Sequence, residues 1–246
     1  MKRRHLLFTL LALWLPELAN AADGAVVLVT GATGQTGRLT VAALARKGLV
    51  VRGMVRSAES AATLPAGVAA TVADVTQPAS LAAAVKGVAV VISTLGARFP
   101  VGENGFAAVD WEGNRALIDA AKAAGVRHFI LLSAGSAGRD GFPYSWSISP
   151  YPWKAKSEAH LRRSGMPYTI IAAGGLRDDP GGQKGIRLAP RDRYQSAGIS
   201  RADLALVLAA CVGEAAAMGK TITVVNDEAM APGAWRRDFG RLPADR

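Results

Sequence analysis

The sequence is poor in the residues that build disulfides and metal sites. Its 246 residues include one cysteine, Cys211, and three histidines. One cysteine cannot form an internal disulfide or a thiolate metal cluster, and its place in the apolar stretch 204–212 predicts a buried, inert thiol. His5, His128 and His160 do not have the spacing of metal ligands, so we predict no metal site.

The sequence also lacks a basic run, and no basic stripe is interleaved with aromatic residues, although the formal net charge is +10. Its arginines are scattered, so the basic surface of a soluble domain explains the charge better than nucleic-acid binding does. Half of the residues are hydrophobic and 20% are charged, which is the composition of a globular protein. The length fits one domain.

The hydrophobic run near the N-terminus is too short for a membrane anchor, because residues 6–15 span about 15 Å as a helix. Lys2, Arg3 and Arg4 precede the run, and Ala19-Asn20-Ala21 follows it, which is the order of an export signal. We expect residues 1–21 to be removed, leaving an exported, periplasmic protein without a stable membrane anchor. The alternatives are an uncleaved helix or a misassigned start codon, with a cytoplasmic product.

From residue 22 onward, strand-like and helix-like segments alternate, which predicts an α/β fold with a parallel sheet. We expect a doubly wound Rossmann-type domain over residues 22–226 and a poorly ordered C-terminal tail over residues 227–246. The stretches 134–153 and 174–199 are rich in Gly, Pro and Asp, and both follow strands. Ligands bind outside the carboxyl ends of such strands, so these stretches should form a small loop-built substrate lobe. The expected strands are 25–30, 49–55, 69–72, 88–93, 128–132, 168–172 and 221–225, and the expected helices are 35–47, 80–86, 107–124, 154–163 and 201–212.

A glycine-rich turn follows the first expected strand and opens the first expected helix, which is the context that a dinucleotide-binding turn requires. Gly31 permits the tight turn, Gly34 lets the backbone approach a pyrophosphate, and Gly37 lets the helix pack on the strand. The pyrophosphate would then face the helix N-terminus, whose N–H groups and dipole favour an anion. The alternative is a glycine-rich turn with no ligand.

The end of the second strand points to the cofactor. An NAD site usually has an acidic residue about twenty residues beyond the glycines, to bind the ribose hydroxyls. Here Arg56 lies nineteen residues after Gly37, Arg38 follows the last glycine, and the nearest acid, Glu59, comes three residues late. Guanidinium groups suit a 2′-phosphate, so we predict NADP(H), with NAD(H) as the second choice. The alternative is that Arg56 is a solvated surface charge.

Several further motifs follow the glycine turn in a fixed order. They are Asp74-Val75, Thr94-Leu95-Gly96, Val109 to Asn114, Ile130 to Ser133, Ser164 to Ile171 and Ser200 to Asp203. With the turn from Gly31 to Arg38, this set resembles the atypical short-chain dehydrogenase/reductases with NmrA-like or flavin-reductase-like domains. The resemblance covers residues 25–226.

The resemblance implies a role for each matching residue. Asp74 and Val75 would contact the adenine, and Lys154 the ribose. Asp74 could instead cap its strand, and Ser133 could be a buried hydroxyl bonded to the backbone. The turn contacts would come from Gly31, Thr33, Gly34, Gln35, Thr36 and Gly37, a further cofactor contact from Arg56, and the nicotinamide-side contacts from Thr94, Leu95, Gly96 and Ser133.

The catalytic half departs from the Tyr-x-x-x-Lys pattern of the superfamily, in which the tyrosine is the acid. Tyr151 precedes Lys154 by three residues, and the prolines on both sides of Tyr151 predict that it lies before the helix begins. Tyr144 is the alternative acid. Related chains often have Arg-Pro where this one has residues 172–173, Ala-Ala. The candidate catalytic set is Ser133, Tyr151 and Lys154, for a small organic substrate; a non-catalytic NADP(H)-binding module is the alternative.

The first prediction concerns export. N-terminal sequencing of the native protein should find a chain that starts at Ala22, and cell fractionation should find it outside the cytoplasm. If the Arg-Arg pair belongs to a twin-arginine signal, changing both Arg3 and Arg4 to lysine should block export. An intact Met1 in the cytosolic fraction would refute export. A cleaved product from the double-lysine variant would refute only the twin-arginine route.

Overall fold

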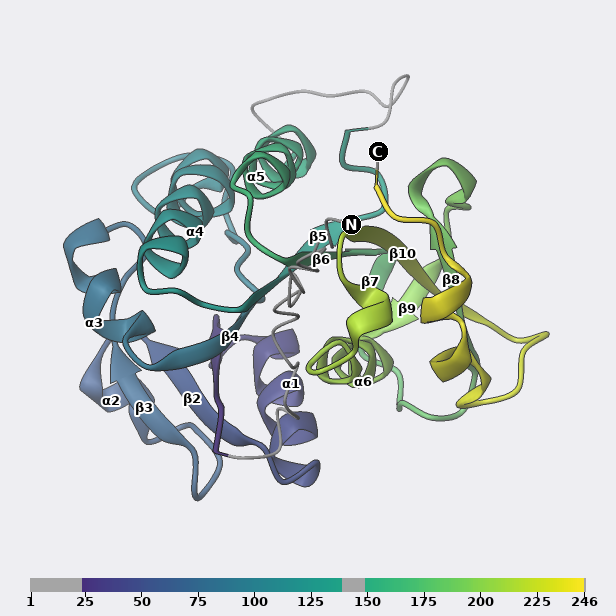
Figure 1. Ribbon diagram of the computed structural model, residues 1–246, viewed down its shortest axis with the longest axis horizontal. Helices are drawn as coiled ribbons and strands as arrows, with labels where there is room; N and C mark the ends of the chain where they lie inside the picture. The colour runs from purple at the N-terminus through teal and green to yellow at the C-terminus, as the bar shows by residue number, and fades with distance from the viewer. Residues whose placement is uncertain (1–23, 139–148, 246) are drawn as a thin grey trace, which may run out of the picture.

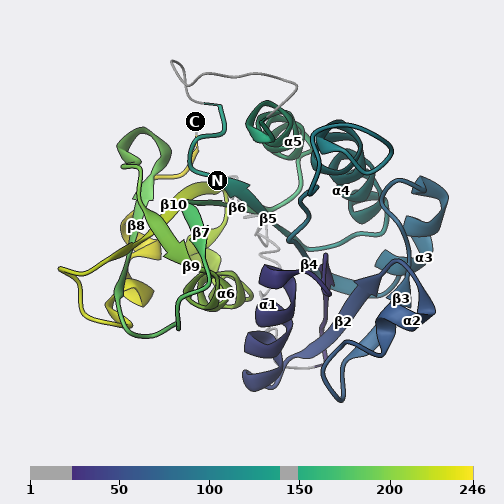
Figure 2. The same cartoon turned by 180° about the vertical axis from the view of Figure 1, so that it is seen from behind.

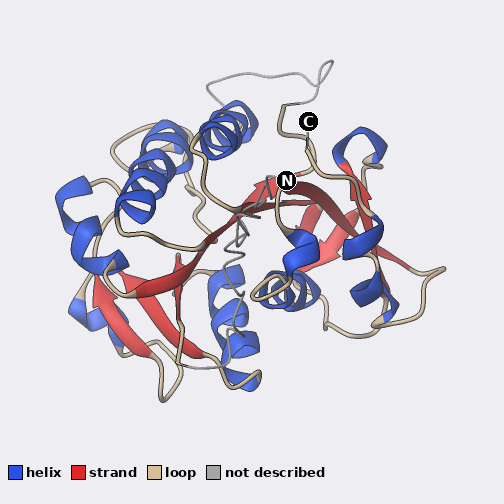
Figure 3. Cartoon of the chain, viewed as in Figure 1, coloured by secondary structure: helices blue, strands red, loops and turns tan. Residues whose placement is uncertain are grey.

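The protein is described by a computed structural model, which gives residues 24–138 and 149–245. A twisted eight-stranded sheet in the order β3-β2-β1-β4-β5-β6-β10-β8 runs through the molecule, with helices on both faces (Figures 1 and 3). This order reverses between β1 and β4, which defines the doubly wound Rossmann fold. The residues of the expected export signal lie outside the described part. Among the described residues, no helix combines the length and apolar character needed to cross a bilayer.

The inner parallel strands are mostly buried apolar runs, as sheets covered on both faces require, whereas the edge strand Ala69–Val72 is largely exposed. The sheet strands are β1 (Val26–Thr30), β2 (Val50–Val55), β3 (Ala69–Val72), β4 (Val88–Ser93), β5 (His128–Ala134), β6 (Tyr168–Ala173), β8 (Gly185–Pro190) and β10 (Lys220–Asp227). The seven expected strands are therefore confirmed within two residues at each end.

Two separate cores lie on the two faces of the sheet. Helices α1 (Gln35–Arg46) and α6 (Arg201–Ala210) pack together on one face. Helices α3 (Leu81–Val85), α4 (Asn114–Ala123) and α5 (Tyr151–Arg163) cover the other face, and the short α2 (Ala58–Ala61) follows β2 (Figure 2). Cys211 is fully buried in the α1/α6 core, and burial raises the pKa of its thiol.

We expected the stretch 174–199 to be built of loops, but it contains three strands. It contains β8, which pairs antiparallel with β10 and forms one edge of the main sheet. It also contains β7 (Gly175–Arg177), which pairs with β9 (Gly198–Ser200) in a separate two-stranded sheet. Ile186 and Leu188 are buried, while Arg187 between them is half-exposed. The sequence therefore contained the alternation of apolar and polar residues that is typical of a strand.

The expectation of a poorly ordered C-terminal tail was wrong for the described part of that segment. Residues 234–241 form two short 3₁₀ turns, and Trp235 and Phe239 are buried in the α1/α6 core. Asp245 accepts hydrogen bonds from Tyr168 Oη at 3.0 Å and Thr221 Oγ1 at 2.6 Å. Two aromatic anchors and a carboxylate therefore attach the segment to the sheet.

The long helix expected over 107–124 is divided in the structure. Residues Ala107–Gly113 (η2) wind as a π-helix, and α4 continues from Asn114. Asn114 Nδ2 donates to the carbonyl oxygens of Val109 and Asp110, and Ser157 Oγ donates to the same Asp110 oxygen. Side chains thus bind carbonyls at the point where the wider turn changes the helical register.

The second prediction concerns His128, a buried histidine at the amino end of β5. Its Nε2 lies 2.9 Å from Thr169 Oγ1, whose own proton goes to the Ala217 carbonyl, so Nε2 carries a proton and donates it to Thr169. Burial lowers the pKa of His128 from 6.5 to about 4. Between these values the unfolded chain binds a proton that the native protein does not. The free energy of unfolding should therefore fall by about 2–3 kcal/mol from His128 alone between about pH 7 and about pH 4.5.

Urea unfolding at the two pH values tests this. The variant His128→Gln should lose less stability on acidification than the wild type, by about that amount. An unchanged pH dependence in His128→Gln would contradict the assignment.

Candidate functional site

The glycine turn lies at the carboxyl edge of the sheet, beside the reversal of strand order. Gly31 has a φ of +71°, which favours glycine, and a Cβ there would lie 3.0 Å from Thr94 Oγ1. A Cβ on Gly37 would lie 2.0 Å from the Gly31 carbonyl oxygen. Gly34 has ordinary backbone angles, and its Cβ would meet that oxygen at 3.2 Å, which is tight but close to normal contact. Two of the three glycines are thus required by the fold itself.

The N-terminus of α1 opens onto this edge. Within the described residues no side chain caps this helix end, and its first turn contains no acidic residue. The first N–H groups of a helix have no partner inside the helix, and the dipole favours an anion there. Thr33 and Gln35 are exposed, whereas Thr36 is buried. The turn therefore leaves backbone donors at this edge, and the pyrophosphate contact stays a prediction.

Arg56 follows the end of β2 and is exposed at the same edge. Its Nη1 lies 3.5 Å from Asn104 Oδ1, a long contact to the segment that follows β4. Arg38, in the first turn of α1, is also exposed. Both guanidinium groups are accessible to a phosphate.

Asp74 and Val75 follow β3 and have local structural partners. Asp74 Oδ1 accepts from the backbone N–H and the hydroxyl of Thr76, both at 2.9 Å, so this oxygen caps the turn. Val75 is buried against Gly113, where a Cβ would lie 2.7 Å from Val75 Cγ2. Capping, one of the two roles considered for Asp74, is therefore present, and its adenine contact stays a prediction.

Thr94, Leu95 and Gly96 extend from β4 between the glycine turn and α5. Thr94 Oγ1 donates to the Thr30 carbonyl at 2.7 Å, which ties the ends of β1 and β4 together. Leu95 contributes its carbonyl oxygen, 3.4 Å from Lys154 Nζ. Gly96 is exposed. The segment thus joins the two halves of the predicted site.

Lys154 is held by a buried carboxylate. Its Nζ lies 2.8 Å from Asp110 Oδ1, and the Asp110 side chain is fully buried in η2. Asp110 Oδ2 accepts from the backbone N–H of Ala97 at 3.0 Å. Asp110 therefore fixes both the lysine and the segment after β4. The sequence analysis did not assign it a role, although it lies in the motif Val109 to Asn114.

Tyr151 is the first residue of α5, which corrects the expectation that it precedes the helix. The backbone N–H of Lys154 donates to the Pro150 carbonyl at 2.9 Å, so the first turn is closed. Prolines are tolerated here because first-turn N–H groups need no partner inside the helix. Tyr151 and Lys154 therefore share a helix turn. Tyr144, the alternative acid, lies outside the described residues.

Ser133 is buried near the end of β5, and within the described residues its hydroxyl bonds to a side chain and not to the backbone. Its Oγ donates to Glu158 Oε1 on α5 at 2.5 Å. Glu158 also binds Arg191 and Arg162, at 2.5 and 3.0 Å. No local pattern in the sequence indicated that Ser133 would bond to Glu158, or that Glu158 would pair with these arginines.

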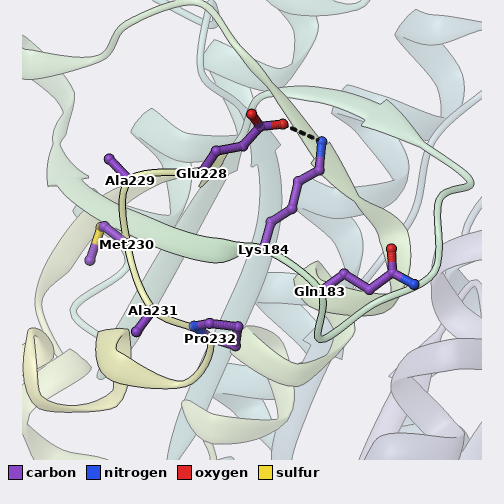
Figure 4. Close-up of a pocket in the computed structure, with 7 residues that line it drawn as sticks. All are labelled: Gln183, Lys184, Glu228, Ala229, Met230, Ala231 and Pro232. Atoms are coloured by element: carbon purple, nitrogen blue, oxygen red, sulfur yellow. Dashed lines mark hydrogen bonds and ion pairs between the residues drawn. The ribbon is translucent and has the colours of Figure 1, made fainter.

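A separate hollow lies on the surface beyond β10 (Figure 4). It is lined by residues 183–184 and 228–232, and the exposed pair Lys184–Glu228 crosses it at 2.7 Å. Its lining includes none of the predicted site residues. We therefore assign the hollow no part in cofactor binding.

Comparison with known proteins agrees with this geometry. The profile of the NAD(P)H-binding family matches residues 31–215. The chain belongs to this NAD(P)H-binding family. The resemblance to the atypical short-chain dehydrogenase/reductases is confirmed.

The individual relatives have different functions. The chain is 31% identical to sanguinarine reductase of Eschscholzia californica, over 76% of this chain and 84% of that one. It is 38% identical to the photosystem II assembly factor Ycf39 of Cyanophora paradoxa, over 59% of this chain and 44% of that one, so it spans less than half of that relative. The crystal structure of the oxidoreductase ylbE from Lactococcus lactis superposes with a TM-score of 0.73 at 23% identity, over 88% and 95% of the chains, which shows the fold.

The third prediction separates binding from folding at the glycine turn. Gly34→Val should abolish NADPH binding and leave the fold intact, because the backbone at residue 34 accepts a side chain while the pyrophosphate surface does not. Gly37→Val should instead damage the fold, because its Cβ would overlap the Gly31 carbonyl. Circular dichroism and NADPH titration of both variants check this. Normal NADPH affinity in a folded Gly34→Val protein would place the site elsewhere.

Proposed function

We propose that this protein is an NADPH-dependent reductase of a small organic substrate of the quinone, flavin or carbonyl type. The observation that supports this most is the Lys154–Asp110 pair, which holds a cationic side chain beside the Thr94–Gly96 segment. Hydride transfer is the chemistry that a bound nicotinamide cofactor supplies, while the protein binds and orients. Lys154 would hold the ribose, and Tyr151 on the same helix turn would supply a proton.

The preference for NADPH over NADH is part of the proposal. Arg56 and Arg38 are exposed at the edge where the adenosine ribose is expected, and charge-assisted bonds to a 2′-phosphate suit both. Among the described residues, Arg56 contacts Asn104 at 3.5 Å, which is long for a hydrogen bond, so the guanidinium can turn toward a phosphate.

The alternative is a non-catalytic NADP(H)-binding module, acting as a sensor or an assembly factor. It is favoured by Ser133, whose only hydroxyl proton goes to Glu158, so this hydroxyl has none to offer a substrate carbonyl. The assembly-factor relative supports the same alternative.

NADPH oxidation against a panel of quinones, flavins and aldehydes distinguishes the two functions. Turnover of any panel member supports the reductase. Tight NADPH binding without turnover on the whole panel supports the module.

The fourth prediction concerns cofactor choice. Arg56→Glu should weaken NADPH binding by about ten- to a hundredfold, because a phosphate partner becomes a like charge, and should leave NADH binding nearly unchanged. Arg127→Glu is the matched control, since it makes the same charge change at an exposed residue that precedes β5, at the opposite edge of the sheet. Calorimetric titration with both cofactors measures the effect. Equal losses for NADPH and NADH would contradict the assignment.

A further inference from the structure

A buried carboxylate joins three distant parts of the chain beside the proposed site. Glu158 is 3% exposed on the inner face of α5. Its Oε1 accepts from Ser133 Oγ and from Arg191 Nη2, both at 2.5 Å, and its Oε2 accepts from Arg162 Nη2 at 3.0 Å. Two guanidinium partners require the ionised carboxylate, which can only accept hydrogen bonds. Ser133 is therefore the donor, and its orientation depends on where Glu158 is held.

Besides Glu158, Arg191 also binds the chain that leaves β5. It begins the 3₁₀ turn η3 (Arg191–Arg193), directly after β8. Its Nη1 donates to the carbonyl oxygens of Ala134 and Gly135, at 2.9 and 3.4 Å, and to that of Ala137. The chain that leaves β5 thus curves around the guanidinium group of Arg191. Nη1 binds the carbonyl oxygens of this segment, and Nη2 binds Glu158.

Tyr194 restrains the same segment from another side. A Cβ on Gly135 would lie 2.3 Å from the Tyr194 ring, so the ring lies directly on the backbone at residue 135. The N–H of Gly135 donates to the Ala173 carbonyl at 2.7 Å, which continues the pairing of β5 with β6. Residues 134–137 therefore have a fixed conformation at the carboxyl edge of the sheet.

We propose that Arg191 is a positioning residue for the substrate side of the site. It fixes residues 134–137 directly and the Ser133 hydroxyl through Glu158, at the strand end that follows β4 in the sheet order. The inference rests on the proposed reductase function, because this side would receive the oxidised substrate. In the described part of the chain, the hydrogen bonds of Arg191 go to Glu158 and to residues 134–137 and not to the glycine turn or Arg56, so its effect should be separable from NADPH binding.

Substitution of Arg191 tests the proposal, with Arg193 as the matched control on the same turn, where it is exposed. NADPH affinity is measured by titration, and KM and kcat are measured with phenanthrenequinone as the probe substrate. Arg191→Met should raise the KM for the quinone by about tenfold or more, with NADPH affinity within about twofold of wild type. The KM of Arg191→Lys should lie between those of the wild type and Arg191→Met, because an ammonium group cannot bond Glu158 and the loop carbonyls at the same time. Arg193→Met should match the wild type.

Hydrogen exchange keeps the proposal testable in every case. Faster amide exchange confined to residues 134–138 in Arg191→Met supports the positioning role, and added guanidinium ion should restore the KM of Arg191→Ala. An unchanged KM, or a parallel loss of NADPH affinity with exchange raised throughout the sheet, would overturn it. If the wild type turns over no panel substrate, the reductase function fails separately, and unchanged exchange at residues 134–138 would then overturn the role of Arg191 as well.

Discussion

The site depends on how closely helix α1 approaches the end of strand β1. A Cβ at residue 37 would lie 2.0 Å from the Gly31 carbonyl oxygen, so the helix can approach the end of β1 this closely only if residue 37 is glycine. This start points the uncapped N-terminus of α1 at the edge where the strand order reverses. The hydrogen bond of Thr94 Oγ1 to the Thr30 carbonyl ties β4 to the same edge. Helix N–H groups at such a terminus favour an anion, so the backbone geometry that the fold requires is also the one that the proposed pyrophosphate site would use.

A second set of polar contacts organises the other half of the site. Asp110 is fully buried and pairs with Lys154, and its carbonyl binds Asn114 and Ser157. Breaking a buried ion pair by removing one partner costs several kcal/mol, so this arrangement is rigid and holds the lysine in one place. Asp110 itself lies in the π-helix, and from there its carboxylate accepts the N–H of Ala97 in the segment after β4. Pre-organisation of this kind is what a protein adds to the chemistry of its cofactor.

The sequence was informative where a physical requirement was local. The apolar strands and the position of the glycine turn between the first strand and the first helix could be predicted because each depends on neighbours in the chain. The sequence was uninformative where contacts are long-range: Arg191 meets the chain after β5 from 57 residues away, and no periodicity records that. β8 was missed because glycine and proline at its ends outweighed a short alternation of Ile186 and Leu188. Trp235 was missed because one aromatic residue in a polar segment gives no periodic signal, although it is buried in the core. Tyr151 was misplaced because its prolines break helix interiors but not first turns.

A crystal structure with NADP⁺ tests the central claim most directly. The account predicts the pyrophosphate over the N-terminus of α1, within hydrogen-bond distance of backbone N–H groups in residues 33–36. It also predicts the 2′-phosphate at Arg56 and the nicotinamide ribose at Lys154. Density for the cofactor away from the glycine turn, or a 2′-phosphate that points into solvent far from Arg56, would contradict the account.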